Sequence, residues 1–105
     1  MVLLVFCSFP DEAAAAAATT ILVEERLVAC GTILPGARSI YVWDEKMEDL
    51  AEVMVIFKTM GPAYAPLEKR LRKLHPYKNP EIVAIEAGAA SWPYAAWVAA
   101  ATQVS

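Results

Sequence analysis

Two uninterrupted apolar runs constrain the fold of this chain more than any other feature. Val2–Cys7 and Val53–Phe57 contain only apolar residues. Runs of this length that are rich in Val, Leu and Ile are typical of strands covered on both faces. The intervening segments have helical patterns instead. The sequence therefore predicts a sheet with helices packed against it.

The helical segments are recognised by alanine content, by spacing and by their ends. An alanine tract at 13–18 favours a first helix over 11–27, because alanine is the best helix former. After Gly61-Pro62, one helical stripe predicts a second helix, and Pro76 ends it at His75 because the residue before a proline disfavours helical geometry. The stripe consists of Tyr64, Leu67, Leu71 and Leu74. A third, short helix is expected over 91–102.

Two further strands complete the pattern. Residues 28–34 predict a strand that continues over 38–43, with a kink or bulge at Pro35-Gly36, since proline cannot donate to a strand ladder. A polar turn over 44–49 should lead to the strand 52–59, and a last strand is expected over 81–86. The order is βαββαβ with an extra C-terminal helix. This predicts a ferredoxin-like α+β sandwich with an antiparallel sheet.

The composition suits one small domain that needs a partner. The chain has 105 residues, so a single domain over 1–105 is expected. Its hydrophobic residues amount to 58%, whereas typical domains have roughly 45–50% apolar residues. The helices of this fold cover one face of the sheet and leave the other bare in a monomer. We therefore expect a buried interface between subunits.

Charge and hydropathy exclude several classes of function. The net charge of −3 disfavours nucleic-acid binding, which needs a basic surface. No apolar run is long enough to span a bilayer, and Val2–Cys7 lacks the basic flank of a signal peptide. We expect a cytoplasmic protein with no membrane partner, in which Cys7 and Cys30 are reduced.

Short segments spread in order over nearly the whole chain match the pattern of a known family. They are Cys7, Pro10–Ala13, Leu22–Cys30, Ile33–Gly36, Ser39–Tyr41 with Trp43, Lys58-Thr59, Leu74–Tyr77, Pro80–Ile82, and the Tyr94–Trp97 spacing. Together these segments resemble the CutA-type divalent-cation tolerance family. The resemblance implies a ferredoxin-like subunit in a compact trimer whose long hairpin strands and C-terminal segment pair across subunits. It also implies an association with divalent-metal tolerance, copper especially.

Three residues are candidate metal ligands. Cys7, Cys30 and His75 offer thiolate and imidazole, which suit Cu or Zn. No C-x-x-C or H-x-x-x-H spacing supports them, and the alternative is that both cysteines are buried packing residues and that His75 makes a structural hydrogen bond. The resemblance favours Cys7 and His75 as the metal positions. Some members have a second His where this chain has Leu74, so we expect only weak binding of Cu(II) or another divalent cation.

A second group of residues predicts a ligand cleft. Trp43, Lys58, Tyr77 and Glu81, together with His75, could meet at one end of the sheet or between subunits. An aromatic wall with a Lys and a carboxylate could bind a small metabolite. The alternative is that the aromatic residues pack in an interface and that Lys58 and Glu81 form an ordinary ion pair.

The functional prediction is a non-enzymatic homotrimer that binds divalent metal. A single His and scattered glycines provide neither a catalytic triad nor a phosphate-binding loop. The alternatives are a signal-sensing trimer that binds a metabolite in a cleft between subunits, and a structural trimer that organises partner proteins.

Overall fold

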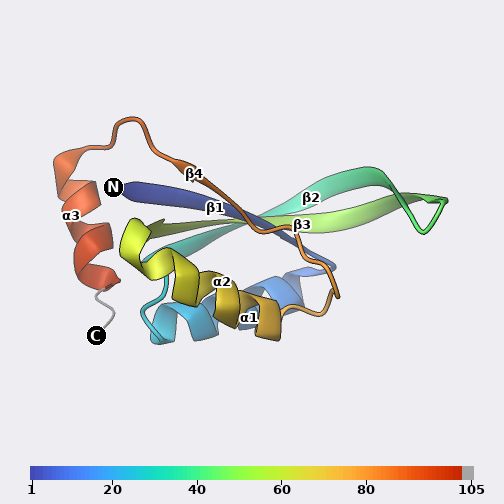
Figure 1. The fold of residues 1–105 in the computed structure, drawn as a ribbon, viewed down its shortest axis with the longest axis horizontal. Helices are drawn as coiled ribbons and strands as arrows, with labels where there is room; N and C mark the ends of the chain where they lie inside the picture. The colour runs from blue at the N-terminus through green and yellow to red at the C-terminus, as the bar shows by residue number, and fades with distance from the viewer. Residues whose placement is uncertain (103–105) are drawn as a thin grey trace.

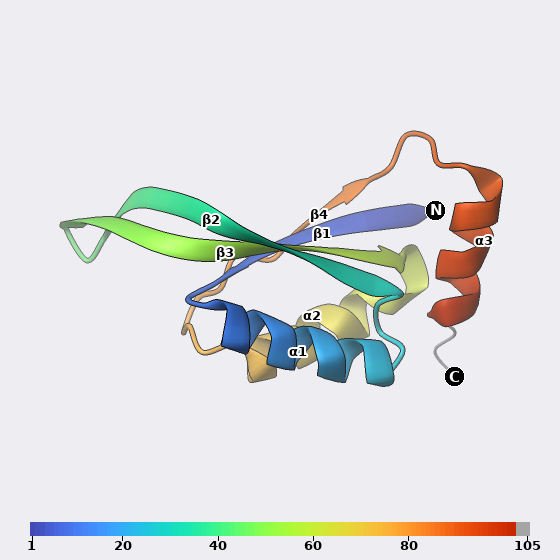
Figure 2. The same cartoon turned by 180° about the vertical axis from the view of Figure 1, so that it is seen from behind.

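The computed structural model describes residues 1–102 and confirms the predicted order of elements. The antiparallel sheet has the order β2-β3-β1-β4, and α1 and α2 cover one of its faces (Figures 1 and 2). This is the ferredoxin-like arrangement with an added C-terminal helix. The elements are β1 (Val2–Phe9), α1 (Glu12–Glu24), β2 (Cys30–Trp43), β3 (Lys46–Met60), a 3-10 turn (Gly61–Ala63), α2 (Tyr64–Leu74), β4 (Val83–Glu86) and α3 (Trp92–Ala101).

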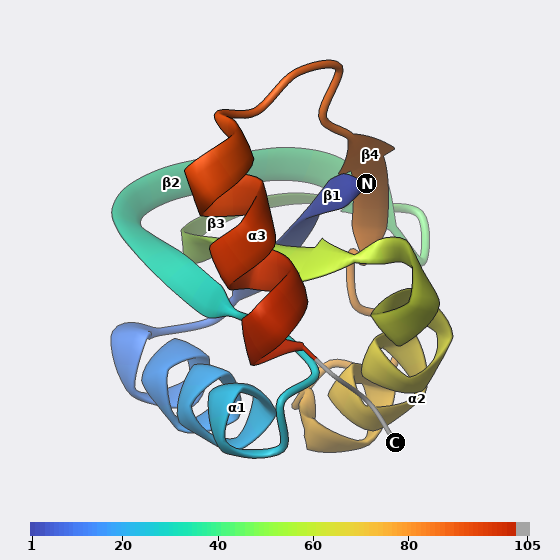
Figure 3. The same ribbon diagram turned by 90° about the vertical axis from the view of Figure 1, so that its left-hand side faces the viewer.

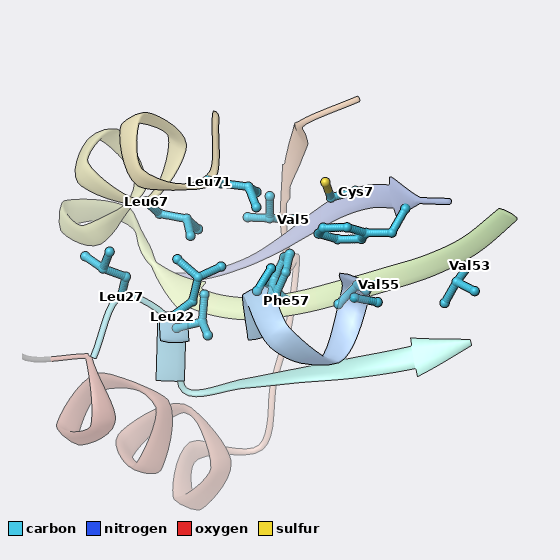
Figure 4. Packing of buried hydrophobic residues seen from close by; sticks show 13 residues of the cluster. Val5, Cys7, Leu22, Leu27, Val53, Val55, Phe57, Leu67 and Leu71 are labelled. Atoms are coloured by element: carbon cyan, nitrogen blue, oxygen red, sulfur yellow. The ribbon is translucent and has the colours of Figure 1, made fainter. Parts of the chain in front are cut away.

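The core lies between the sheet and the two helices. Side chains alternate along β1 and β3, so Val5, Cys7 and Phe9 share a face with their antiparallel partners Phe57, Val55 and Val53. All six are buried, and α1 and α2 close the layer with leucines (Figure 4). The core residues on these two helices are Ala15, Ala18, Leu22, Leu67 and Leu71.

Helix α1 begins and ends for local reasons. Asp11 is the N-cap, and its side chain accepts a 2.7 Å hydrogen bond from the backbone N–H of Ala14. The helix ends at Glu24 and not at the predicted Leu27, because Arg26 adopts a left-handed backbone with φ 62°. Leu27 is thereby turned into the core.

The hairpin of β2 and β3 is longer and tighter than predicted. The expected bulge is present, since the register shifts between Leu34 and Ala37 and Gly36 has φ 87°. The predicted polar turn over 44–49 is wrong. Only Asp44 and Glu45 form the turn, with φ 51° and 65°, as a two-residue turn between twisted strands requires.

Part of this hairpin projects beyond the rest of the sheet. Strand β1 pairs with β3 only over Val53–Met60, so residues 46–52 pair with β2 alone. The projecting part is visible in Figures 1 and 2. Its apolar side chains Ile40, Val42 and Met47 are exposed.

The last helix closes the opposite end of the sheet. Figure 3 shows α3 crossing the end of the sheet, where it contacts β3 and β1. Val98 is fully buried there, whereas Trp92 and Trp97 are exposed. No helix among residues 1–102 has the length and apolar character needed to cross a membrane.

Candidate functional site

A cleft of about 800 Å³ opens where the hairpin leaves the body of the sheet. One wall comes from β2, and the other wall comes from the segment between α2 and β4. The floor comes from Ser8 near the end of β1 and from Glu52 in the middle of β3. The lining residues are Ser8, Ser39, Ile40, Tyr41, Trp43, Glu52, Pro76, Tyr77, Lys78, Asn79, Pro80 and Glu81.

His75 holds the second wall in place. Its Nε2 lies 2.7 Å from the carbonyl oxygen of Ser8, and its Nδ1 accepts a 3.0 Å hydrogen bond from the backbone N–H of Tyr77. Because Nδ1 accepts, Nε2 must carry the proton and donate to Ser8, so the ring is neutral. The ring also stacks on the ring of Phe9, with 4.5 Å between the two ring centroids. Burial lowers the pKa of His75, although the Ser8 bond and Glu52 act the other way.

Glu52 is the buried acid of the cleft. Its side chain is 5% exposed, and Oε2 accepts a 2.7 Å hydrogen bond from the Tyr77 hydroxyl. Burial and this bond raise the pKa of the Tyr77 phenol, so it stays a donor. Oε1 of Glu52 has no hydrogen-bond partner among residues 1–102. Glu52 lines the cleft, so Oε1 is the oxygen of this carboxylate that is left for a ligand.

The cleft contains three of the four predicted ligand residues. Trp43, Tyr77 and Glu81 line it, and Lys58 does not. Lys58 is six residues beyond Glu52 along β3, which corresponds to about 20 Å of extended strand. Its Nζ donates to Thr32 Oγ1 on the neighbouring strand. The predicted alternative of an ion pair with Glu81 is also absent from the described residues, where the two ion pairs are Arg38–Asp49 and Arg70–Glu25.

Comparison with known proteins identifies the family. The family model described as CutA1 divalent ion tolerance protein matches residues 3–101. The chain belongs to the CutA1 family. The Divalent-cation tolerance protein CutA of Pectobacterium atrosepticum is 36% identical over 94 residues, which cover 90% of this chain and 86% of that protein.

Solved CutA structures share the fold over their whole length. CutA from Xylella fastidiosa superposes with a TM-score of 0.94 at 36% identity, covering 97% of this chain and 98% of that one. The divalent cation tolerance protein (Cut A1) from Thermus thermophilus has a TM-score of 0.94 at 37% identity, with 98% and 100% covered. The ferredoxin-like prediction and the predicted CutA resemblance are confirmed.

The predicted thiolate–imidazole pair does not fit a metal ion in this CutA1 chain as it stands. Cys7 is fully buried in the core, where burial raises the pKa of its thiol to about 12, and Glu81 and Glu52 push in the same direction (Figure 4). Both ring nitrogens of His75 are already hydrogen-bonded. Metal ligation needs a thiolate and a free nitrogen lone pair. Metal binding at Cys7 and His75 stays a prediction.

Cys30, the third candidate, lies on β2, and its Sγ is 3.8 Å from the hydroxyl of Tyr94. No group of three or more His, Cys, Asp or Glu residues is arranged for a metal within residues 1–102.

Sequence reasoning missed Glu52 and Ser8. In the sequence, Glu52 directly precedes an apolar run, and this position is typical of the solvent-exposed end of a strand. A weak signal exists, since Glu52 directly precedes Val53–Phe57, the buried run of β3. Its hydrogen-bond partner Tyr77 is 25 residues later in the chain.

Proposed function

We propose that this chain acts in divalent-cation tolerance as a non-catalytic homotrimer that binds a divalent cation weakly in the cleft. Copper(II) is the ion we expect to bind best. The observation that carries the proposal is the buried Glu52 carboxylate, which lines the cleft and whose Oε1 has no hydrogen-bond partner among the described residues.

A bound cation would offset the cost of burying this carboxylate. A buried carboxylate with a single hydrogen bond is poorly compensated, and an ion or a charged donor offsets that cost. Glu81 adds a second carboxylate and Tyr77 adds a phenol oxygen, both from the wall formed by the segment between α2 and β4. The lining contains one basic side chain, the exposed Lys78. The balance of charge in the cleft therefore favours a cation.

The same donor set argues for weak binding. Two carboxylates and a phenol are fewer ligands than a closed site supplies, so water or a neighbouring subunit would fill the other positions. Oxygen donors of this kind accept many divalent ions. Copper(II) stands highest among the first-row divalent metals in affinity for a given site, which supports its choice.

Exposed apolar surface supports the trimer. Val42 and Met47 face each other across the hairpin and are 63% and 71% exposed. Leu34, Val83 and Ile85 are exposed on the sheet as well. Covering both surfaces with other copies of the chain would remove this area from water.

The cleft also supports a role without catalysis. Ser8 and Ser39 line it, and in the described residues neither hydroxyl is hydrogen-bonded to a base. The imidazole of His75 is fully engaged and would have to break a hydrogen bond to accept a proton.

A cytoplasmic location is part of the proposal. Cys7 and Cys30 are free thiols in the structure, which suits a reducing compartment. A relative from Archaeoglobus fulgidus, 25% identical, is described as periplasmic. Cell fractionation with an antibody against this chain tests the location, and recovery in the periplasm would contradict it.

A second candidate function is binding of a small molecule. The cleft volume of about 800 Å³ lies within the range of about 300–1,000 Å³ that is usual for small-molecule sites. Three aromatic side chains line it, and a metal ion would not need them.

Calorimetric titration with Cu(II) at neutral pH tests the metal proposal. We expect Glu52→Gln and Glu81→Gln to weaken binding about tenfold or more, because each removes an anionic oxygen donor. Cys7→Ser is the matched control and should bind as wild type does. Unchanged binding by Glu52→Gln would overturn the cleft site. Loss of binding in Cys7→Ser would instead support the thiolate site predicted from the sequence.

A further inference from the structure

The aromatic lining of the cleft is a feature that a metal site does not explain. Ser39, Tyr41 and Trp43 alternate along β2 and therefore share one face of the strand. That face lines the cleft, and Trp43 remains 48% exposed in it. Tyr77 contributes a third aromatic ring from the opposite wall. A hydrated metal ion would leave these ring faces unused.

The charges near the cleft disfavour an anionic ligand. The nearest guanidinium on the hairpin is that of Arg38, and both its Nε and Nη2 donate to Asp49, at 2.7 and 2.6 Å. The charge of Arg38 is therefore neutralised by Asp49 on the neighbouring strand β3. Lys78 is outnumbered by Glu52 and Glu81, and Glu52 is the more deeply buried of the charged groups. A phosphate or carboxylate group placed here would face net negative charge.

Aromatic faces beside a buried carboxylate form the chemistry that recognises organic cations. The face of a Trp or Tyr ring attracts a cation through its quadrupole, and the attraction strengthens when the cation is desolvated. Glu52 Oε1 supplies the compensating negative charge at the floor of the cleft. A neutral ligand would leave that charge unpaired.

We infer that the cleft between β2 and the 76–81 segment binds a small organic ammonium compound, with its cationic head against Trp43 and Tyr41 and its charge balanced by Glu52. Tyr77 orients Glu52 through its hydroxyl and closes the cleft from the other side. The inference uses the cleft of the proposed metal site, and it depends on the aromatic wall that metal binding does not require.

The test compares choline with its neutral isostere, 3,3-dimethylbutan-1-ol, by calorimetry and by tryptophan fluorescence on the full chain. The two probes have nearly the same shape and differ in charge. We expect choline to bind about tenfold or more tightly than the alcohol, with a change in tryptophan emission. We expect Glu52→Gln to weaken choline binding about tenfold and Trp43→Leu to weaken it several-fold.

Copper titration of the same variants separates this inference from the proposed metal site. Trp43→Leu should weaken choline binding several-fold and keep wild-type copper binding, because it removes a ring and no oxygen donor. Trp43 is exposed, so this variant keeps the test available if Glu52→Gln fails to fold, and light scattering checks its assembly state. Equal binding of the two probes, no choline binding at millimolar concentration, or unchanged choline binding by Trp43→Leu would each overturn the inference.

Discussion

The backbone N–H of Tyr77 donates a 3.0 Å hydrogen bond to Nδ1 of His75, two residues before it in the chain. The opposite nitrogen of the same ring donates to the Ser8 carbonyl on β1. One neutral imidazole thus ties the end of α2, the end of β1 and one wall of the cleft together. Protonation would place a hydrogen on Nδ1, against the Tyr77 N–H.

Stability should therefore fall in mild acid. Burial lowers the pKa of His75 in the folded protein, whereas the unfolded chain has a His pKa near 6.5. The unfolded state then binds more protons than the folded state below about pH 6.5, so the free energy of unfolding decreases as the pH falls through that value. Denaturant unfolding at pH 5 and at pH 8 measures this change in the free energy of unfolding. The His75→Gln variant has no imidazole to titrate, so its free energy of unfolding should depend less on pH. An equal pH dependence in wild type and His75→Gln would contradict this role of His75.

The Cys7 thiol should be unreactive in the folded protein. Burial raises its pKa to about 12, and the side chain has no exposed surface. In a Cys30→Ser background, Cys7 should react with a thiol reagent at pH 8 only as fast as the protein unfolds. The rate of this reaction is measured with a chromogenic thiol reagent, with and without denaturant. Rapid reaction of the native variant would show that Cys7 is accessible and would favour the thiolate metal site.

Gly31 should not tolerate a side chain. A Cβ added there would lie 2.7 Å from Thr19 Cγ2 and 3.0 Å from Phe57 Cδ1. Gly31→Ala should cost about 1–3 kcal/mol of unfolding free energy, because overpacking shifts α1 away from the sheet. Gly88→Ala is the control, since nothing lies within 4 Å of its added Cβ. Equal midpoints of thermal unfolding for the two variants would contradict the close approach.

Light scattering should give about three times the chain mass of 11.4 kDa. Val42→Asp and Met47→Glu should shift the protein toward monomers, since each places a charge on the exposed apolar face of the hairpin. Lys73→Gln on the exposed side of α2 lowers the net charge by the same single unit as each of these variants and should leave the mass unchanged. A stable folded monomer of wild type at micromolar concentration would refute the trimer.

Arg26 should hold the end of α3. Its Nη2 and Nε donate to the carbonyl oxygens of Ala100 and Ala101, at 2.6 and 3.3 Å. These carbonyls have no partners within the helix, and a cation there is worth about 0.3–1 kcal/mol. Arg26→Gln should speed hydrogen exchange of the α3 amides, whereas Arg72→Gln on α2 should not. Unchanged protection of α3 would show that the contact does not anchor the helix.

The sequence by itself determined the order of elements and the family. The apolar runs at 2–7 and 53–57, the stripe of α2 and its end before Pro76 are local patterns, and each became the predicted element. The bulge at Pro35-Gly36 was predictable for the same reason, because a missing N–H and a freely rotating backbone act at their own position.

The tertiary structure decided what the site consists of. Glu52 accepts a hydrogen bond from the hydroxyl of Tyr77, and His75 is neutral because Ser8 and Tyr77 occupy both its nitrogens. Lys58, which the sequence grouped with them, lies farther along the strand. The two-residue turn at Asp44 and Glu45 depended on the register of β2 with β3. These features arise from pairings between distant residues, whose geometry no local pattern in the sequence records.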